Sequence, residues 1–145
     1  MHLWRAFRAL DAEGRRLIVE ATVLLAFVWV GLRTLSFATL RRLLDGYAKR
    51  VAAGSRAPLP RIGWAVDAVG RRFPAARTCL MEALAADVML RRRGYRSEVH
   101  FGVRKRNDRS QPLDAHAWVE CNGGIVVGEL ENLADYALQS APERS

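Results

Sequence analysis

Residues 115–127 contain the feature that most constrains the fold. Residues 115–121 alternate in polarity as a half-buried strand does, residues 122–124 read Asn-Gly-Gly, and residues 125–127 are apolar and β-branched. Asn-Gly sequences favour the left-handed backbone of a tight hairpin loop, so we expect the two apolar runs to pair antiparallel. Counted outward from the turn, this hairpin brings Gly128 and Glu129 level with His116.

An amphipathic helix is predicted over residues 79–93, upstream of that hairpin. Thr78 is a suitable N-cap, and Gly94 suits the position just after the helix end. Cys79 then lies in the first turn, where unpaired N–H groups and the helix macrodipole stabilise a thiolate. A strand over residues 97–103 and a polar loop over residues 104–112 are expected to lead into the hairpin.

Cysteine and histidine in this order indicate nucleophilic chemistry. A thiol needs a nearby imidazole to take its proton, and the imidazole needs a third group on its other nitrogen. A helix packed on the hairpin can bring Cys79 and His116 within hydrogen-bond reach. Because the return strand reaches the level of His116 there, Glu129 is the expected acid, with Glu131 and Asp114 as alternatives.

The polar and aromatic residues of this region could have other roles. Trp118 shares the strand face of His116 and either lines a substrate groove or packs in the core. His100 and Cys121 could join the site residues around a metal, but no Cys-x-x-Cys or His-x-x-x-His spacing occurs, so we predict no metal. There is no glycine-rich phosphate loop, and no cofactor is expected.

Helical patterns occupy roughly the first fifty residues. A short helix should end near Leu10, Asp11 should cap the next helix, and apolar residues keep helical spacing from Leu17 to Leu40 before a further helix. Residues 21–32 are apolar nearly all round, yet only about a dozen uncharged residues lie there, and a membrane span needs roughly 20. We therefore expect a core helix or a docking face for another protein, and no membrane span.

The chain divides at a stretch of small residues with two prolines. We predict a helical N-terminal region over residues 1–52, a linker over residues 53–60, and a second domain over residues 61–145. That domain should begin with a short helix over residues 61–72 and close with a helical turn around residues 133–138. A hydrophobic fraction of 50% excludes a disordered chain.

The net charge of +8 suggests acidic partners, which could be a nucleic acid, a membrane surface or an acidic peptide. No nucleic-acid motif or array of stacking aromatic residues supports the first of these, so we expect no nucleic-acid partner. Two cysteines do not make a disulfide framework, and no secretory signal precedes them. A cytoplasmic location is therefore expected.

Several motifs together resemble one family. They are Cys-Leu-Met-Glu-Ala-Leu at residues 79–84, Arg-Arg-Gly-Tyr at 92–95, His-Phe-Gly-Val at 100–103 and Ala-His-Ala-Trp-Val-Glu at 115–120. Trp-Ala-Val at 64–66 and Arg-Arg-Leu-Ile-Val-Glu-Ala at 15–21 extend the similarity over most of the chain. The set resembles the leader peptidases of lasso-peptide biosynthesis, which are transglutaminase-like processing proteins of microcin-type gene clusters.

The resemblance implies an α+β, papain-like and transglutaminase-like cysteine protease fold. The helix that carries Cys79 would pack on a small antiparallel sheet that carries His116, with a helical extension before them. Cys79 would be the nucleophile and His116 the general base, and the backbone N–H of Cys79 would contribute to the oxyanion hole. The third member in the family is usually an aspartate on the following strand, and Glu129 takes that position here.

The resemblance also implies a substrate and partners. The enzyme would remove the leader from a ribosomally made precursor peptide, and a lasso cyclase would then close a macrolactam ring on the freed amine. Some relatives carry a fused leader-binding domain, but the first sixty residues here read as helices, so a separate leader-binding protein is implied. The apolar N-terminal helices and the Arg-rich loops would dock that protein and an acidic leader. The competing hypothesis is a non-catalytic module that only binds a peptide.

Overall fold

The computed structural model describes residues 2–50, 56–73, 78–105, 110, 113–131 and 133–139. Its elements are α1 (His2–Ala9), α2 (Ala12–Thr34), α3 (Phe37–Ala48), α4 (Leu59–Gly70), α5 (Cys79–Arg92), β1 (Ser97–Lys105), β2 (Leu113–Cys121), β3 (Gly124–Val127), a 3₁₀ turn (Leu133–Asp135) and β4 (Ala137–Gln139). The strands form one antiparallel sheet in the order β3-β2-β1-β4. Helices therefore pack with a small antiparallel sheet, and the predicted α+β class is confirmed.

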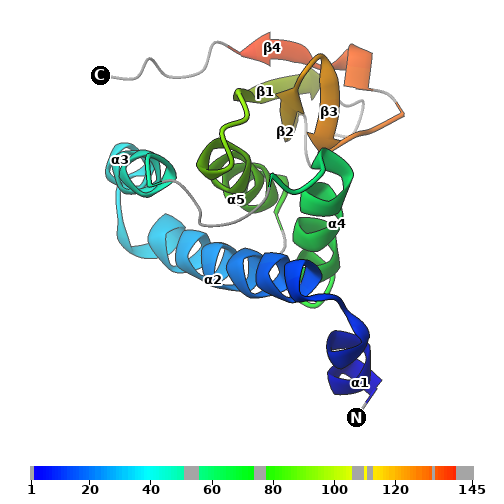
Figure 1. Cartoon of the computed structure of the whole chain (residues 1–145). Helices are drawn as coiled ribbons and strands as arrows, with labels where there is room; N and C mark the ends of the chain where they lie inside the picture. Colours follow the sequence, from blue (N-terminus) through cyan, green and yellow to red (C-terminus); the bar gives the residue numbers. More distant parts are fainter. Residues whose placement is uncertain are drawn as a thin grey trace.

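Helix α5 lies at the centre of the molecule. Figure 1 shows the sheet on one side of α5 and α2 on the other, with α3 and α4 flanking it. Every residue from position 81 to position 90 is buried, including three alanines that let neighbouring elements approach closely. Because α5 contacts α2, α3, α4 and β2, it carries the main hydrophobic core.

The N-terminal helices are divided differently from the prediction. The prediction that helical structure continues from Leu17 to Leu40 was wrong, because α2 ends at Thr34 and Leu35 is extended. Ser36 then caps α3, and its side chain accepts the backbone N–H of Thr39 at 3.2 Å. Apolar periodicity runs through this break because α2 and α3 turn the apolar residues toward one shared core.

The predicted caps and end signals elsewhere are confirmed. Asp11 caps α2 through the backbone N–H of Gly14 at 2.9 Å. Gly94 follows α5 with a φ of +79°, a left-handed conformation that glycine adopts without cost. The predicted closing helical turn near residues 133–138 is only half right, since a 3₁₀ turn is followed by the short edge strand β4.

One hydrophobic core is shared by the two predicted parts of the chain. Buried residues of α2 and α3 share one cluster with those of α4, α5 and the sheet. Residues 53–55 of the predicted linker lie outside the described residues, and Leu59 and Pro60 belong to α4 rather than to the linker. Proline is tolerated there because the backbone N–H groups of the first helical turn have no intrahelical acceptor. The core thus crosses the predicted boundary at residues 53–60.

Helix α2 is long and apolar enough to cross a membrane by length and composition alone, a test that core helices and signal sequences also pass. Here one side of α2 is buried against α4 and α5, and Leu17, Leu24 and Val28 belong to the shared core. Glu20, which directly precedes the apolar run at residues 21–32, is 13% exposed and forms ion pairs with Arg92 and Arg93. The predicted absence of a membrane span stays a prediction.

Two adjacent leucines in α3 test the core described above. Leu44 is 1% exposed and Leu43 is 48% exposed, so they share a helix and differ in burial. We expect Leu44→Ala to lower the free energy of unfolding by about 2–5 kcal/mol, because it removes buried contacts and leaves a cavity. Leu43→Ala should change it by less than about 0.5 kcal/mol. Urea unfolding of both variants checks this, and equal losses would contradict the placement of α3.

Candidate active site

Cys79 begins α5, as the sequence predicted. The hydroxyl of Thr78 accepts the backbone N–H of Met81 at 3.2 Å, which confirms Thr78 as the N-cap. Cys79 is half-buried, and its thiol is free. The unpaired N–H groups of this first turn favour a negatively charged sulfur. Residues 74–77, which lead into the helix, lie outside the described residues.

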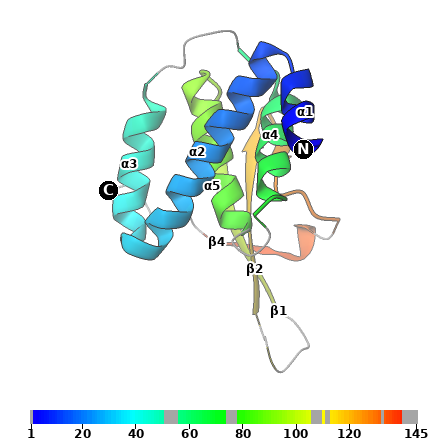
Figure 2. The same ribbon diagram turned by 90° about the horizontal axis from the view of Figure 1, so that it is seen from below.

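The two faces of β2 have different surroundings. Ala117, Val119 and Cys121 are buried in the core that α5 shares, whereas His116 and Trp118 alternate onto the other face. Figure 2 shows that β1 and β2 project beyond the helices at the end where α5 begins. His116 is the fourth residue of β2, and Cys79 is the first residue of α5. Within the described part of the chain, the two side chains form no hydrogen bond with each other.

Aromatic rings surround the imidazole of His116. Its ring is stacked with that of Trp118, with centroids 6.1 Å apart, and lies 5.7 Å from the ring of Tyr136. Gly102 lies opposite His116 in the register of β1 and β2. A Cβ at this glycine would come within 2.7 Å of the Tyr136 Cβ, so glycine is what lets Tyr136 approach this part of the sheet.

Tyr136 was not predicted as part of this region, and the role of Asp114 as an alternative acid stays a prediction. The Tyr136 hydroxyl donates to Asp114 Oδ2 at 2.8 Å, and Arg104 Nη2 bonds the same oxygen at 3.2 Å. These bonds hold the chain after β3 across β1 and β2. The sequence offered little warning, because β4 is only three residues long and Tyr136 directly precedes it.

A backbone carbonyl fixes the orientation of the His116 ring. The distance between His116 Nε2 and the carbonyl oxygen of Gly128 is 2.6 Å. A carbonyl oxygen only accepts hydrogen bonds, so Nε2 must carry the proton. In the neutral imidazole, Nδ1 then has the lone pair and is the nitrogen that can take a proton.

The backbone at Gly128 is suited only to glycine. Its φ is +88°, and a Cβ there would lie 2.7 Å from the Ala117 carbonyl oxygen and 2.8 Å from the Trp118 Cβ. A β-bulge precedes it, because Glu120 pairs with Ile125 but Val119 pairs with Val127, which leaves Val126 as an extra residue. Bulges redirect a strand, and here the redirected chain aims its carbonyl at His116.

Glu129 follows this glycine but does not reach the imidazole. Its side chain is exposed, and within the described part of the chain it makes no hydrogen bond or ion pair. Glu131, the first alternative, is also exposed. The predicted role of Glu129 as the acid stays a prediction, and the acceptor that the structure shows at Nε2 is the carbonyl of Gly128.

Trp118 and Cys121 are both buried. Trp118 is 4% exposed and donates its indole N–H to Glu120 at 3.0 Å, so little of its surface is open to a ligand. Its predicted part in substrate binding stays a prediction. Burial raises the pKa of the Cys121 thiol, although Arg56 opposes this effect. Among the described residues, no three His, Cys, Asp or Glu side chains gather as a metal site would require.

The protonation of His116 gives a direct test of this geometry. We expect neutral His116 to carry its proton on Nε2, because the Gly128 carbonyl can only accept. Long-range ¹H–¹⁵N spectra of the imidazole report which nitrogen is protonated. Glu129→Gln should leave this tautomer unchanged, whereas a proton on Nδ1, or a change of tautomer in Glu129→Gln, would show that another group orients the ring.

Two glycines, Gly128 and Gly124, give a matched pair of substitutions that tests the contact between His116 and the Gly128 carbonyl. Gly128→Ala should destabilise the fold by about 1–2 kcal/mol, because alanine is strained in the left-handed backbone conformation. The added Cβ would also clash with neighbouring atoms, and the variant should disturb the His116 signals. At Gly124, φ is not positive and the nearest atom is 3.9 Å from an added Cβ, so Gly124→Ala should leave those signals in place. Identical imidazole spectra in both variants would contradict the carbonyl contact.

Comparison with known proteins gives one match. A family model described as the transglutaminase-like superfamily matches residues 21–139, which is most of the chain and runs from within α2 to the end of β4. No curated protein and no solved structure matches the chain significantly. The helix that begins with a cysteine, the sheet that carries a histidine and the extent of the match agree on a papain-like, cysteine-protease-like domain. The chain belongs to the transglutaminase-like superfamily.

Proposed function

We propose that this protein is a cysteine peptidase that removes the leader peptide from the precursor of a lasso peptide. Membership of the transglutaminase-like superfamily supports a cysteine-protease-like domain. The leader-peptidase role rests on the resemblance of the motifs around Cys79 and His116. The observation that carries the chemistry is the bond from His116 Nε2 to the Gly128 carbonyl, because it leaves Nδ1 available as a base.

The reaction would proceed through an acyl-enzyme. Nδ1 of His116 takes the proton of the Cys79 thiol, and the sulfur attacks the carbonyl carbon of the scissile peptide bond. The backbone N–H of Cys79, at the start of α5, helps to stabilise the oxyanion. When the C–N bond breaks, the imidazolium gives its proton to the leaving amine, which becomes the new N-terminus of the core peptide. Water, deprotonated by His116, then hydrolyses the thioester and releases the leader.

The proposed enzyme works with partners and needs no cofactor. A separate leader-binding protein would present the precursor, and a lasso cyclase would use the released amine for its macrolactam. We place the enzyme in the cytoplasm, where ribosomal precursors are made. Both cysteines are free thiols, and a reducing compartment suits a cysteine nucleophile. The sequence predicts Glu129 as the third member of the triad, whereas the acceptor bonded to His116 Nε2 is the Gly128 carbonyl, and the tautomer experiment on His116 separates the two.

One observation favours a second function. The Cys79 thiol and the His116 imidazole form no hydrogen bond within the described part of the chain, and the alternation of β2 turns His116 away from the core face. A non-catalytic module that only binds a peptide would be compatible with this arrangement. Bonds between catalytic groups are often long before substrate binds, and the peptidase is therefore the function tested first.

Cleavage of the precursor in the presence of the leader-binding protein tests the proposal. We expect Cys79→Ala and His116→Ala to lose at least about 10³-fold in rate, since each removes a group that acts in the chemical step. His100→Ala and Cys121→Ala are the matched controls, because they replace the same residue types elsewhere in the sheet. Both controls should lose far less activity than Cys79→Ala and His116→Ala, because neither residue has a role in the proposed chemistry.

Three results would change this conclusion. Wild-type cleavage rates in Cys79→Ala would rule out the cysteine mechanism. Tight binding of the precursor without any cleavage by the wild-type protein would support the binding module. Equal losses in His100→Ala and His116→Ala would show that the assay reports folding rather than chemistry, and urea unfolding of each variant guards against that reading.

A further inference from the structure

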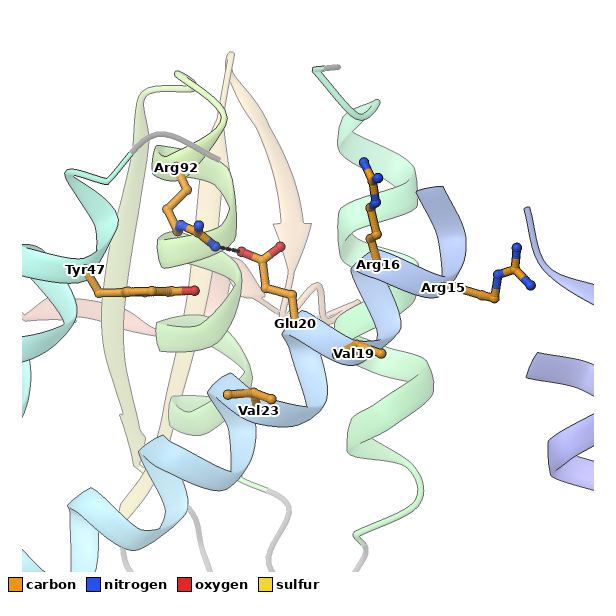
Figure 3. A pocket seen from close by; sticks show the side chains of 7 residues that line it. All are labelled: Arg15, Arg16, Val19, Glu20, Val23, Tyr47 and Arg92. Atoms are coloured by element: carbon orange, nitrogen blue, oxygen red, sulfur yellow. Dashed lines mark hydrogen bonds and ion pairs between the residues drawn. The ribbon is translucent and has the colours of Figure 1, made fainter. Parts of the chain in front are cut away.

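A groove between α2 and α3 lies on the helical side of the molecule, away from the sheet. It encloses about 450 Å³. Figure 3 shows the side chains that line it, which come from α2, α3 and the last turn of α5. We call this pocket the α2–α3 groove, and its lining residues are Arg15, Arg16, Val19, Glu20, Val23, Tyr47 and Arg92.

An exposed apolar stripe continues from the groove along α2. Its members are three or four residues apart and so share one side of the helix. They are Val19, Val23, Phe27 and Val30, which are 53%, 61%, 43% and 48% exposed. On α3, Leu43 and Tyr47 are also exposed. None of these side chains is needed for the core, and contiguous apolar surface of this kind marks a site of association.

The positive charge of the groove favours a partner with acidic side chains. Arg15 and Arg16 are exposed, and neither makes an ion pair within the described part of the chain. Glu20 is the one acidic residue in the lining, and Arg92 and Arg93 already neutralise it. The groove therefore presents unmatched positive charge beside apolar surface, which is complementary to carboxylates beside apolar side chains.

The side chains at the base of the groove are held in place by contacts with one another. Arg92 stacks over the Tyr47 ring at 4.3 Å and donates from Nε to the Arg50 carbonyl at 3.1 Å. With the bond from Arg92 to Glu20, these contacts join α2, α3 and α5. A preformed recess of this kind loses little freedom when a partner binds.

We propose that the α2–α3 groove docks an acidic amphipathic helix of a partner protein. The apolar side of that helix would lie along the α2 stripe, and its carboxylates would pair with Arg15 and Arg16. A helix fits because two exposed helices leave a channel that a third can fill. A lipid surface fits less well, since a bilayer cannot enter a recess between two helices. The identity of the partner rests on the proposed function, which makes it the leader-binding protein.

The location of the groove suits such a partner. Arg92 is the last residue of α5 and Cys79 is the first, so the two ends of α5 are roughly 20 Å apart at the helical rise of about 1.5 Å per residue. A helix docked beside Arg92 would thus leave the start of α5 open to the precursor. About six extended residues span that distance, which is a short length for a leader that the partner holds.

Calorimetric titration of the leader-binding protein into the full chain tests the proposal. We expect Val23→Asp to weaken binding at least tenfold, because it places a carboxylate in the apolar stripe. The double variant R15E/R16E should also weaken binding at least tenfold and flatten its dependence on salt. Leu113→Asp and R5E/R8E are matched controls of similar exposure and charge change outside the groove, and both should bind within twofold of wild type.

The outcomes separate this inference from the proposed function. Binding in the groove variants as tight as in wild type, or no binding by wild type, would overturn the groove even if the precursor were cleaved. Loss of binding in the groove variants alone would support it, even if no cleavage occurred. Co-sedimentation with vesicles of phosphatidylcholine and phosphatidylglycerol is the third arm. Vesicle binding that Val23→Asp abolishes, with partner binding unchanged, would assign the surface to membranes and overturn the proposal.

Discussion

The structure depends on the burial of α5 from every side. Residues 81–90 have no exposed position, so α2, α3, α4 and the sheet must all be in place for this helix to leave water. Its alanines allow close approach, while Leu84, Met89 and Leu90 fill the space between layers. One consequence concerns the site: Cys79 is held at the start of a helix that cannot shift without disturbing the core. A second concerns α2 and α3, whose buried residues are part of this core.

Local signals were enough for many elements. Asp11, Thr78 and Gly94 each have a side chain or backbone preference that works within one turn, and each acts as its residue type predicts. The break at Leu35 was missed because apolar spacing continues through it, and only Ser36 signals the new helix. Strand β4 was missed for another reason. Three residues carry little periodicity, and β4 exists because β1 offers an edge to pair with.

The candidate site contains both side chains that residue type can predict and a backbone group that it cannot. Cys79 and His116 could be proposed from residue type, because thiol and imidazole chemistry belongs to side chains. The group at Nε2 of His116 could not, because it is a backbone carbonyl, and its position follows from a bulge at Val126 and a left-handed glycine. A search for a carboxylate leads to Glu129, one residue further along. The bond from Nε2 to this carbonyl also sets the tautomer that a general base acting through Nδ1 would require.

The central claim is that His116 activates Cys79. The most direct measurement is the rate of carboxymethylation of each cysteine by iodoacetate at pH 6, followed by mass spectrometry of the two peptides. The account predicts that Cys79 reacts at least about tenfold faster than cysteine in a short peptide, since the thiolate is the reacting species. His116→Ala should remove that advantage, and buried Cys121 should stay unmodified throughout. A Cys79 that reacts no faster than a free thiol, with or without His116, would contradict the account.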